Sequence, residues 1–179
     1  MTRNPAPRGW CRRLSSAILA YRPWLADHGS LTRRLKQRCP KFGVRPLRQG
    51  LGRPLPDERE WLGLGRAEMA LVREVYLICG ATPVVFAHSV LVPEDLRGVW
   101  NPVSRQGVKP LGEALFSDPR VERAPLEYRE LGRQHPLYRR ACAALAQPPT
   151  RLWARRSLFT LRSRPLLVTE VFLPAVLEL

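Results

Sequence analysis

Two pairs of apolar segments, each pair joined by a short polar turn, most constrain how this chain can fold. The first pair is residues 71–79 and 83–93, which read LVREVYLIC and PVVFAHSVLVP, and the second is residues 151–163 and 164–174. Apolar and polar residues alternate along residues 71–79, and a short connection such as 80–82 joins antiparallel strands. We therefore expect two β-hairpins and an α+β fold built on a mostly antiparallel sheet.

Short helical patterns and irregular segments surround the expected hairpins. Residues 23–39 contain two helical patterns divided at His28 and Gly29, with Ser30 as the N-cap of the second. This helix-turn-helix outline also occurs in DNA-binding pairs, but its single Leu31/Leu35 apolar pair fits a lid or packing element better. Before the first hairpin we expect an extended first half of 44–56 and a segment at 59–70 that leads into the strand at 71–79. After that hairpin we expect an irregular connection at 94–110, helices at 110–119 and 135–149, and a strand at 121–132 that is kinked at Pro125.

The length and charge of the chain bound its organisation and its partners. With 179 residues we expect one domain over 1–179, of which residues 1–20 are loosely ordered. The formal net charge is +15, and residues 1–53 contain thirteen basic side chains but one acid, Asp27, so any anion is attracted. Arginine outnumbers lysine 27 to 3, and aromatic residues are 8% of the chain and are not interleaved with the basic ones. We therefore expect no specific nucleic-acid site.

The spacing of cysteine and histidine residues indicates whether a metal site is expected, and the length of the apolar runs indicates whether a membrane span is expected. The cysteines at 11, 39, 79 and 142 are far apart and, with three histidines, form no zinc-type spacing. We expect free thiols in a reducing cytoplasm and no metal site. No apolar run approaches the ~18 residues of a spanning helix, so we expect no membrane span and a cytoplasmic protein.

Glu170 is the one carboxylate in the middle of the last apolar strand. Alternation places it on a face with Leu166, Val168 and Phe172, and the opposite face is apolar as well, so the strand is expected to be covered on both sides. A buried carboxylate that loses its partner costs about 3–5 kcal/mol, so Glu170 must be neutralised, hydrogen-bonded or paired. It is either a structural anchor or ion pair, or a ligand-binding group.

Arg73 raises the same question on the first hairpin, because it shares a strand face with Leu71, Val75 and Leu77. Its guanidinium either snorkels to solvent, pairs with a glutamate within the sheet, or meets an anionic ligand. His88 lies in the middle of its strand and is interpreted as a core histidine with satisfied partners.

The second hairpin brings cations toward Glu170. A turn near Ser163 and Arg164 would place Glu170 roughly opposite Ser157 and on a face with Arg155, although a slip of one residue would substitute Arg156. A carboxylate and arginines within apolar walls predict a pocket for a small, flat, anionic ligand.

Several segments, in order, are similar to one enzyme family. They are DHGSLTRRL at 27–35, LVREVYLICGATPVVFAHSVLVP at 71–93, KPLGEALF at 109–116 and LWARRSLFTLRSRPLLVTEVFLPA at 152–175. From about residue 22 onward the chain resembles chorismate pyruvate-lyase. REVYL, PLGxxLF and LxTExFLPA are the most specific of these motifs.

This resemblance implies a function. The family converts chorismate to 4-hydroxybenzoate and pyruvate without a cofactor, the first committed step toward ubiquinone in many Gram-negative bacteria. Its fold is an antiparallel sheet on which two helix-turn-helix flaps close over an internal pocket. The motifs carry over Arg73 and Glu170 as catalytic and substrate-binding residues, and Leu31 and Leu111 as flap contacts. The family's pattern has methionine where this chain has Leu31, so a main-chain contact carries over there more readily than a side-chain role.

The resemblance also predicts behaviour. A pocket closed by flaps should retain its aromatic product and be inhibited by it. Segment 133–150 is longer than in the shortest members and is interpreted as a surface elaboration. We expect a monomer whose partners are chorismate and 4-hydroxybenzoate. A ligand sensor of the same fold and a basic nucleic-acid binder are the alternatives.

Overall fold

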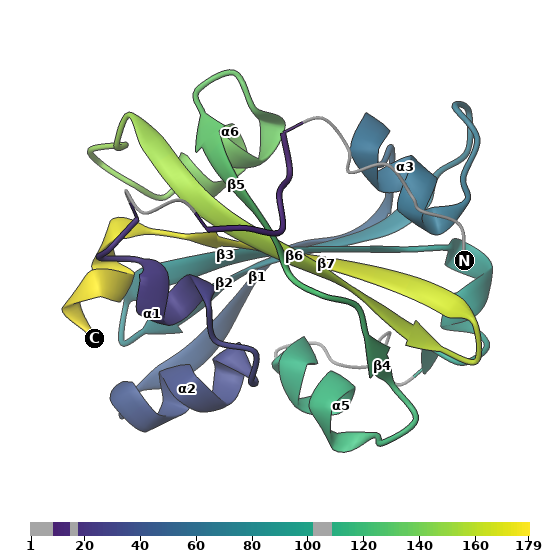
Figure 1. Cartoon of the computed structure of the whole chain (residues 1–179), viewed down its shortest axis with the longest axis horizontal. Coiled ribbons are helices and arrows are strands. Elements are labelled where there is room, and N and C mark those ends of the chain that lie inside the picture. Colours follow the sequence, from purple (N-terminus) through teal and green to yellow (C-terminus); the bar gives the residue numbers. More distant parts are fainter. Residues whose placement is uncertain (1–8, 15–17, 102–108) are drawn as a thin grey trace.

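The protein is built on one antiparallel sheet of seven strands (Figure 1). The computed structural model describes residues 9–14, 18–101 and 109–179. The strands follow the order β1-β2-β3-β7-β6-β4, and β5 also pairs with β6. They are β1 Phe42–Gly52, β2 Ala70–Cys79, β3 Thr82–Leu91, β4 Glu122–Arg123, β5 Glu127–Gly132, β6 Arg151–Leu161 and β7 Arg164–Phe172. The predicted α+β class is confirmed.

Short helices cover both faces of the sheet. They are α1 Arg22–Leu25, α2 Leu31–Arg38, α3 Pro56–Leu62, α5 Leu111–Ser117 and α6 Pro136–Cys142, with 3₁₀ turns η1 Pro93–Leu96 and η2 Pro174–Glu178. Helices α1, α2 and α5 lie on one face, and α3 and α6 on the other (Figure 1). Among the described residues no helix is long and apolar enough to cross a bilayer.

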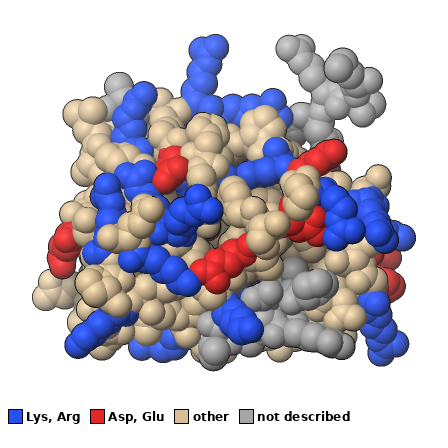
Figure 2. Space-filling view, turned by 90° about the horizontal axis from the view of Figure 1, so that it is seen from below, with Lys and Arg blue, Asp and Glu red and all other residues tan. Residues whose placement is uncertain are grey.

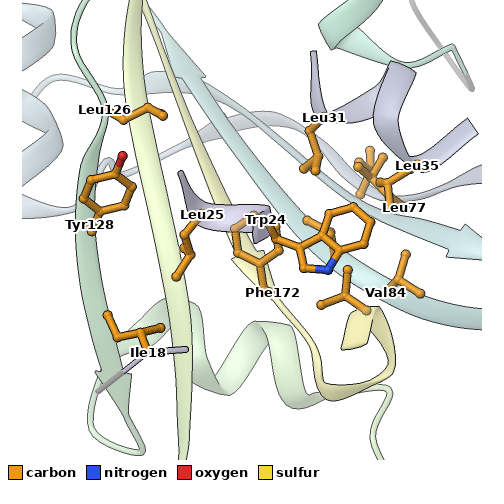
Figure 3. Packing of buried hydrophobic residues seen from close by; sticks show 13 residues of the cluster. Ile18, Trp24, Leu25, Leu31, Leu35, Leu77, Val84, Leu126, Tyr128 and Phe172 are labelled. Atoms are coloured by element: carbon orange, nitrogen blue, oxygen red, sulfur yellow. The ribbon is translucent and has the colours of Figure 1, made fainter. Parts of the chain in front are cut away.

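The helix pair predicted at 23–39 is present as α1 and α2. The Oγ atom of Ser30 accepts a hydrogen bond from the backbone N–H of Arg33 at 3.3 Å, as expected of an N-cap. Trp24, Leu25 and Leu35 of this pair pack against Leu77 and Phe172 of the sheet (Figure 3). Burying each such leucine contributes about 1.5–3 kcal/mol, so the pair is anchored to the sheet by its apolar face.

Helix α3 was not expected in the lead-in to β2. Its sequence signals are Pro56 at the first position, acidic residues in the first turn, and Gly63 after its end with φ +66°. Residues 1–8 and 15–17 of the predicted loose start, and 102–108 of the irregular connection, lie outside the described residues. Within the described part of the start, Trp10 and Ile18 are buried.

Both predicted hairpins are present, but the register of the second differs from the prediction. The turn is at Arg162 and Ser163, whose φ angles are +48° and +63°, and Glu170 lies opposite Arg155 instead of Ser157. A two-residue turn of this kind favours glycine or asparagine at both positions, and neither is present to mark it. The face was predicted correctly, because Arg155 and not Arg156 shares the side of Glu170.

The prediction of four free thiols is wrong for two of them. Cys39, just after α2, and Cys79, at the end of β2, form a disulfide across 40 residues of chain, with Cα atoms 5.7 Å apart. Cys11 and Cys142 are free. The pairing of β1 with β2 sets Phe42 opposite Cys79 and so brings Cys39 beside Cys79, which spacing in the sequence could not indicate.

Candidate active site

A cavity lies between the sheet and the helices of one face. The strands β2, β3, β7 and β6 form its floor, and the α1–α2 turn, α2 and α5 cover it. The space that no atom fills, including that at the mouth, is about 610 Å³. Its described lining residues are Gly29, Leu31, Thr32, Arg73, Val75, Leu77, Ala87, Ser89, Pro110, Leu111, Gly112, Leu115, Phe116, Arg123, Arg155, Ser157, Phe159, Val168 and Glu170.

Two rows of side chains run across the floor, and each row takes one residue from each of four strands. Arg73 begins one row on β2 and Glu170 belongs to the next row on β7. The Cα atoms of Arg73 and Glu170 lie about 12 Å apart, because two strand spacings of about 4.8 Å and one two-residue step of about 6.7 Å along a strand separate them. A ring can therefore lie between the two side chains. The rows are Arg73, Ser89, Val168, Ser157 and Val75, Ala87, Glu170, Arg155.

Glu170 is held by the arginine directly across the hairpin. Its Oε2 accepts a hydrogen bond from Nε of Arg155 at 2.5 Å, and its side chain keeps 18% of its exposure. Arg155 is fully buried, and its Nη1 also donates to the backbone carbonyls of Trp24 at 2.9 Å and Asp27 at 2.6 Å. Arg155 thus joins Glu170 to the α1–α2 turn. Glu170 is both an ion-pair partner and part of the cavity wall.

Arg73 does not snorkel, because it is 4% exposed. Its Nη2 donates a hydrogen bond to the carbonyl of Lys109 at 3.1 Å, just before α5. Burial lowers the pKa of Arg73 below its ordinary value, as expected when water is withdrawn from a cation. The adjacent Glu74 points to the opposite face of the sheet, where it pairs with His88. An anion in the cavity would therefore meet a cation that has already lost most of its water.

Leu31 and Leu111 are the first residues of the two covering helices, and both are buried. The first N–H groups of a helix have no partner within the helix, so each flap presents backbone donors near the cavity. Leu31, Leu111, Arg73 and Glu170 were predicted to be ligand-binding residues from separate segments, and the structure brings all four to one cavity.

The two flaps touch at Gly112. A methyl group at this position would lie 2.9 Å from Oγ1 of Thr32, closer than side chains normally approach. An ion pair between Lys36 of α2 and Glu113 of α5 also joins the flaps. The glycine of the PLGxxLF motif therefore allows α5 to lie against α2.

Arg123 is a cavity residue that sequence reasoning missed. It comes from the two-residue strand β4, and its guanidinium lies over the rings of Phe116 and Phe159 at 5.2 and 5.3 Å. Its Nη1 donates to the carbonyl of His28 at 2.7 Å. Only the pairing of β4 with β6 directs this side chain to the cavity, and so short a strand has no periodicity that could have signalled it.

His88 lies on the opposite face and is a core histidine with partners, as predicted. Its ring nitrogens lie 3.1 Å from Oε1 of Glu58 and 3.0 Å from Oε1 of Glu74, and all three residues are buried. Burial alone lowers the pKa of His88, but the two carboxylates outweigh it and raise the pKa to about 9. Arg156, on this same face, pairs with Asp57 and Glu127.

On the face that α2 and α5 cover, the described basic side chains do not form a single stripe. Figure 2 shows the face covered by α2 and α5, on which lysine and arginine side chains are scattered and acidic residues lie among them. On this face the described residues therefore give a duplex or single strand no continuous basic track to follow.

The fold defines an α+β domain with a cavity between its sheet and the covering helices. The effector domain of PhnF from Mycobacterium smegmatis is similar to it, with a TM-score of 0.56 and 14% identity over 82% of this chain and 89% of that domain. The C-terminal domain of the histidine utilization repressor from Pseudomonas syringae pv. tomato has a TM-score of 0.54 and 8% identity over 75% and 92%. At such identities the likeness concerns the fold alone.

The sequence places the chain more narrowly. The family model described as chorismate lyase matches residues 9–178. The "Probable chorismate pyruvate-lyase" of Nitrosomonas europaea is 49% identical over 98% of both chains, and the protein of the same name from Azoarcus sp. is 55% identical over 88% of this chain and 86% of its own. The chain belongs to the chorismate lyase family, a family of enzymes.

Proposed function

We propose that the protein is a lyase that converts chorismate to 4-hydroxybenzoate and pyruvate. The observation that carries this proposal is that Arg73 and Glu170 line one cavity, in a chain of the chorismate lyase family. In organisms that make ubiquinone, this reaction would supply the aromatic precursor of that pathway.

The reaction is an elimination, for which the protein must position the substrate and need not supply an oxidant or a reductant. The C–O bond between the ring and the enolpyruvyl group breaks, the neighbouring ring carbon that bears the hydroxyl loses a proton, and the ring becomes aromatic. The enolpyruvyl group leaves with the bonding electron pair as the enolate of pyruvate, which takes up one proton at its methylene carbon and becomes pyruvate. No electrons enter or leave, and aromatisation supplies the driving force.

Arg73 binds the carboxylate on the ring. A guanidinium donates two parallel hydrogen bonds to a carboxylate, and such bonds are strong where water is excluded. Because Arg73 is buried and its pKa is lowered by burial, an arriving anion restores part of the lost solvation. Loss of Arg73 should weaken the binding of substrate and product alike.

Glu170 accepts a hydrogen bond from the ring hydroxyl and lies next to the carbon that loses its proton. A carboxylate there can either orient the ring or receive the proton. Arg155 holds one oxygen of Glu170 in place, so its other oxygen is available to the ligand side. The flaps then exclude water, and the backbone N–H groups at the starts of α2 and α5 lie near the ring.

A ligand-sensing role is the second candidate, because solved domains of similar fold include an effector domain and the C-terminal domain of a repressor. The deciding experiment is to incubate the purified protein with chorismate and to measure pyruvate with lactate dehydrogenase and 4-hydroxybenzoate by chromatography. Equal amounts of both products, absent with an Arg73→Gln variant, support the lyase. Saturable binding of 4-hydroxybenzoate without turnover would identify a sensor and overturn the proposal.

A further inference from the structure

The cavity contains more positive charge than a monocarboxylate can balance. Its described lining includes three guanidinium groups, those of Arg73, Arg123 and Arg155, and one carboxylate, that of Glu170. These leave two positive charges in excess. An excess of one sign of charge in a covered site is costly, so this lining favours a ligand with two negative charges over a ligand with one.

Arg155 and Arg73 are engaged in other contacts. Arg155 binds Glu170 and two backbone carbonyls of the α1–α2 turn. Arg73 lies on β2, two strands away from Glu170, where it can meet one carboxylate. The cation that remains for a second carboxylate is Arg123.

Arg123 is built for such a contact. Its guanidinium lies over the rings of Phe116 and Phe159, which contact each other edge to face, and its Nη1 donates to the carbonyl of His28. Its Nε is buried and donates to no acceptor in the described part of the chain. Burial lowers the pKa of Arg123, and the charge of Glu170 acts in the opposite direction. The edge formed by Nε and Nη2 is one through which a guanidinium binds a carboxylate with two hydrogen bonds.

We propose that Arg123 binds the second carboxylate of the substrate, which belongs to the enolpyruvyl group and leaves with pyruvate, and that it thereby distinguishes substrate from product. This inference rests on the proposed lyase function. Chorismate carries a ring carboxylate and an enolpyruvyl carboxylate, whereas 4-hydroxybenzoate keeps only the first. When the C–O bond breaks, the carboxylate on Arg123 departs with the three-carbon fragment, and the retained product is bound through Arg73 and Glu170 alone.

Two measurements on the same variants test this assignment. With Arg123→Gln, kcat/KM for chorismate should fall roughly 10- to 100-fold, the range expected for a lost charge-assisted pair, while the Kd of 4-hydroxybenzoate changes less than about threefold. Arg73→Gln should weaken both. Arg120→Gln is the matched control, because Arg120 lies three residues away, is exposed and pairs with Asp118 outside the cavity. Circular dichroism establishes that each variant is folded.

A purely structural role for Arg123, anchoring the flaps through His28 and Phe116, would weaken substrate and product to the same degree. That result, or an unchanged kcat/KM, would overturn the inference. A stable dicarboxylate, 3-carboxymethoxy-4-hydroxybenzoate, allows a binding measurement that does not depend on turnover. It should bind the wild type more tightly than 4-hydroxybenzoate, and Arg123→Gln should abolish the difference. If the wild type released no pyruvate, the lyase proposal would fail, whereas this binding difference would still decide the role of Arg123.

Discussion

Replacing Gly112 by alanine should impair closure of the flaps without destabilising the fold. The new methyl group would lie 2.9 Å from Oγ1 of Thr32 and 3.7 Å from Oγ of Ser30, both on the α2 flap. The first separation is too short, so α5 must retreat by a few tenths of an ångström or Thr32 must leave its preferred rotamer. Either response costs about 1–2 kcal/mol. Alanine is also about 1 kcal/mol more favourable than glycine within a helix, so α5 itself is not weakened.

The cost applies to the closed state, in which the two flaps touch. We expect the Kd of 4-hydroxybenzoate to rise about 5- to 30-fold, mostly through faster dissociation. Isothermal titration calorimetry gives the Kd, and stopped-flow fluorescence the dissociation rate. The free energy of unfolding, measured with urea, should remain within about 1 kcal/mol of the wild type.

A second substitution tests the reasoning. Thr32→Ala removes Oγ1 and leaves Cβ of residue 32 at 3.7 Å from the added methyl, an ordinary contact distance. The double variant of Thr32→Ala and Gly112→Ala should therefore recover most of the lost affinity. The reasoning is refuted if Gly112→Ala binds product within twofold of the wild type, or if the double variant binds no better than Gly112→Ala alone.

Three further predictions concern Glu170, His88 and the product. Glu170→Gln should lower turnover of chorismate by roughly 100-fold or more if the carboxylate takes part in proton transfer, and a near-normal initial rate would remove it from the chemistry. Glu58 and Glu74 raise the pKa of His88 from 6.5 to about 9. The protonated imidazole should therefore contribute about 3 kcal/mol to the free energy of unfolding. This contribution should be complete below pH 6.5 and should be lost as the pH rises through 9. Urea unfolding at pH 6 and pH 10 measures this loss, which should be absent in His88→Gln. Added 4-hydroxybenzoate should inhibit the steady-state rate, because the flaps must open to release it; rates independent of added product would contradict closure.

The elements with local causes could be predicted from the sequence. Alternation in 71–79 and 83–93 identifies a hairpin, because a strand's two faces are set by residues two apart. Ser30 marks the start of α2 through its own side chain. Arg73 and Glu170 stood out as charged residues on apolar strand faces, and the strand faces on which they lie are those predicted.

Several features required the tertiary structure. The turn at Arg162 and Ser163 contains no glycine or asparagine, so the partner of Glu170 was misplaced by two residues. The disulfide of Cys39 and Cys79 depends on the pairing of β1 with β2, in which Phe42 lies opposite Cys79. No pattern near Arg123 indicated that β4 would direct it into the cavity.

The sequence by itself determined the strands of the two hairpins, the helix pair at 23–39 and which charged residues lie on apolar strand faces, since these follow from neighbours along the chain. The tertiary structure decided which of those charges meet, because pairing across strands and between flaps depends on contacts between distant residues. Such contacts pair Glu170 with Arg155 and pair His88 with Glu58 and Glu74. They also bring Arg73 and Arg123 to one cavity.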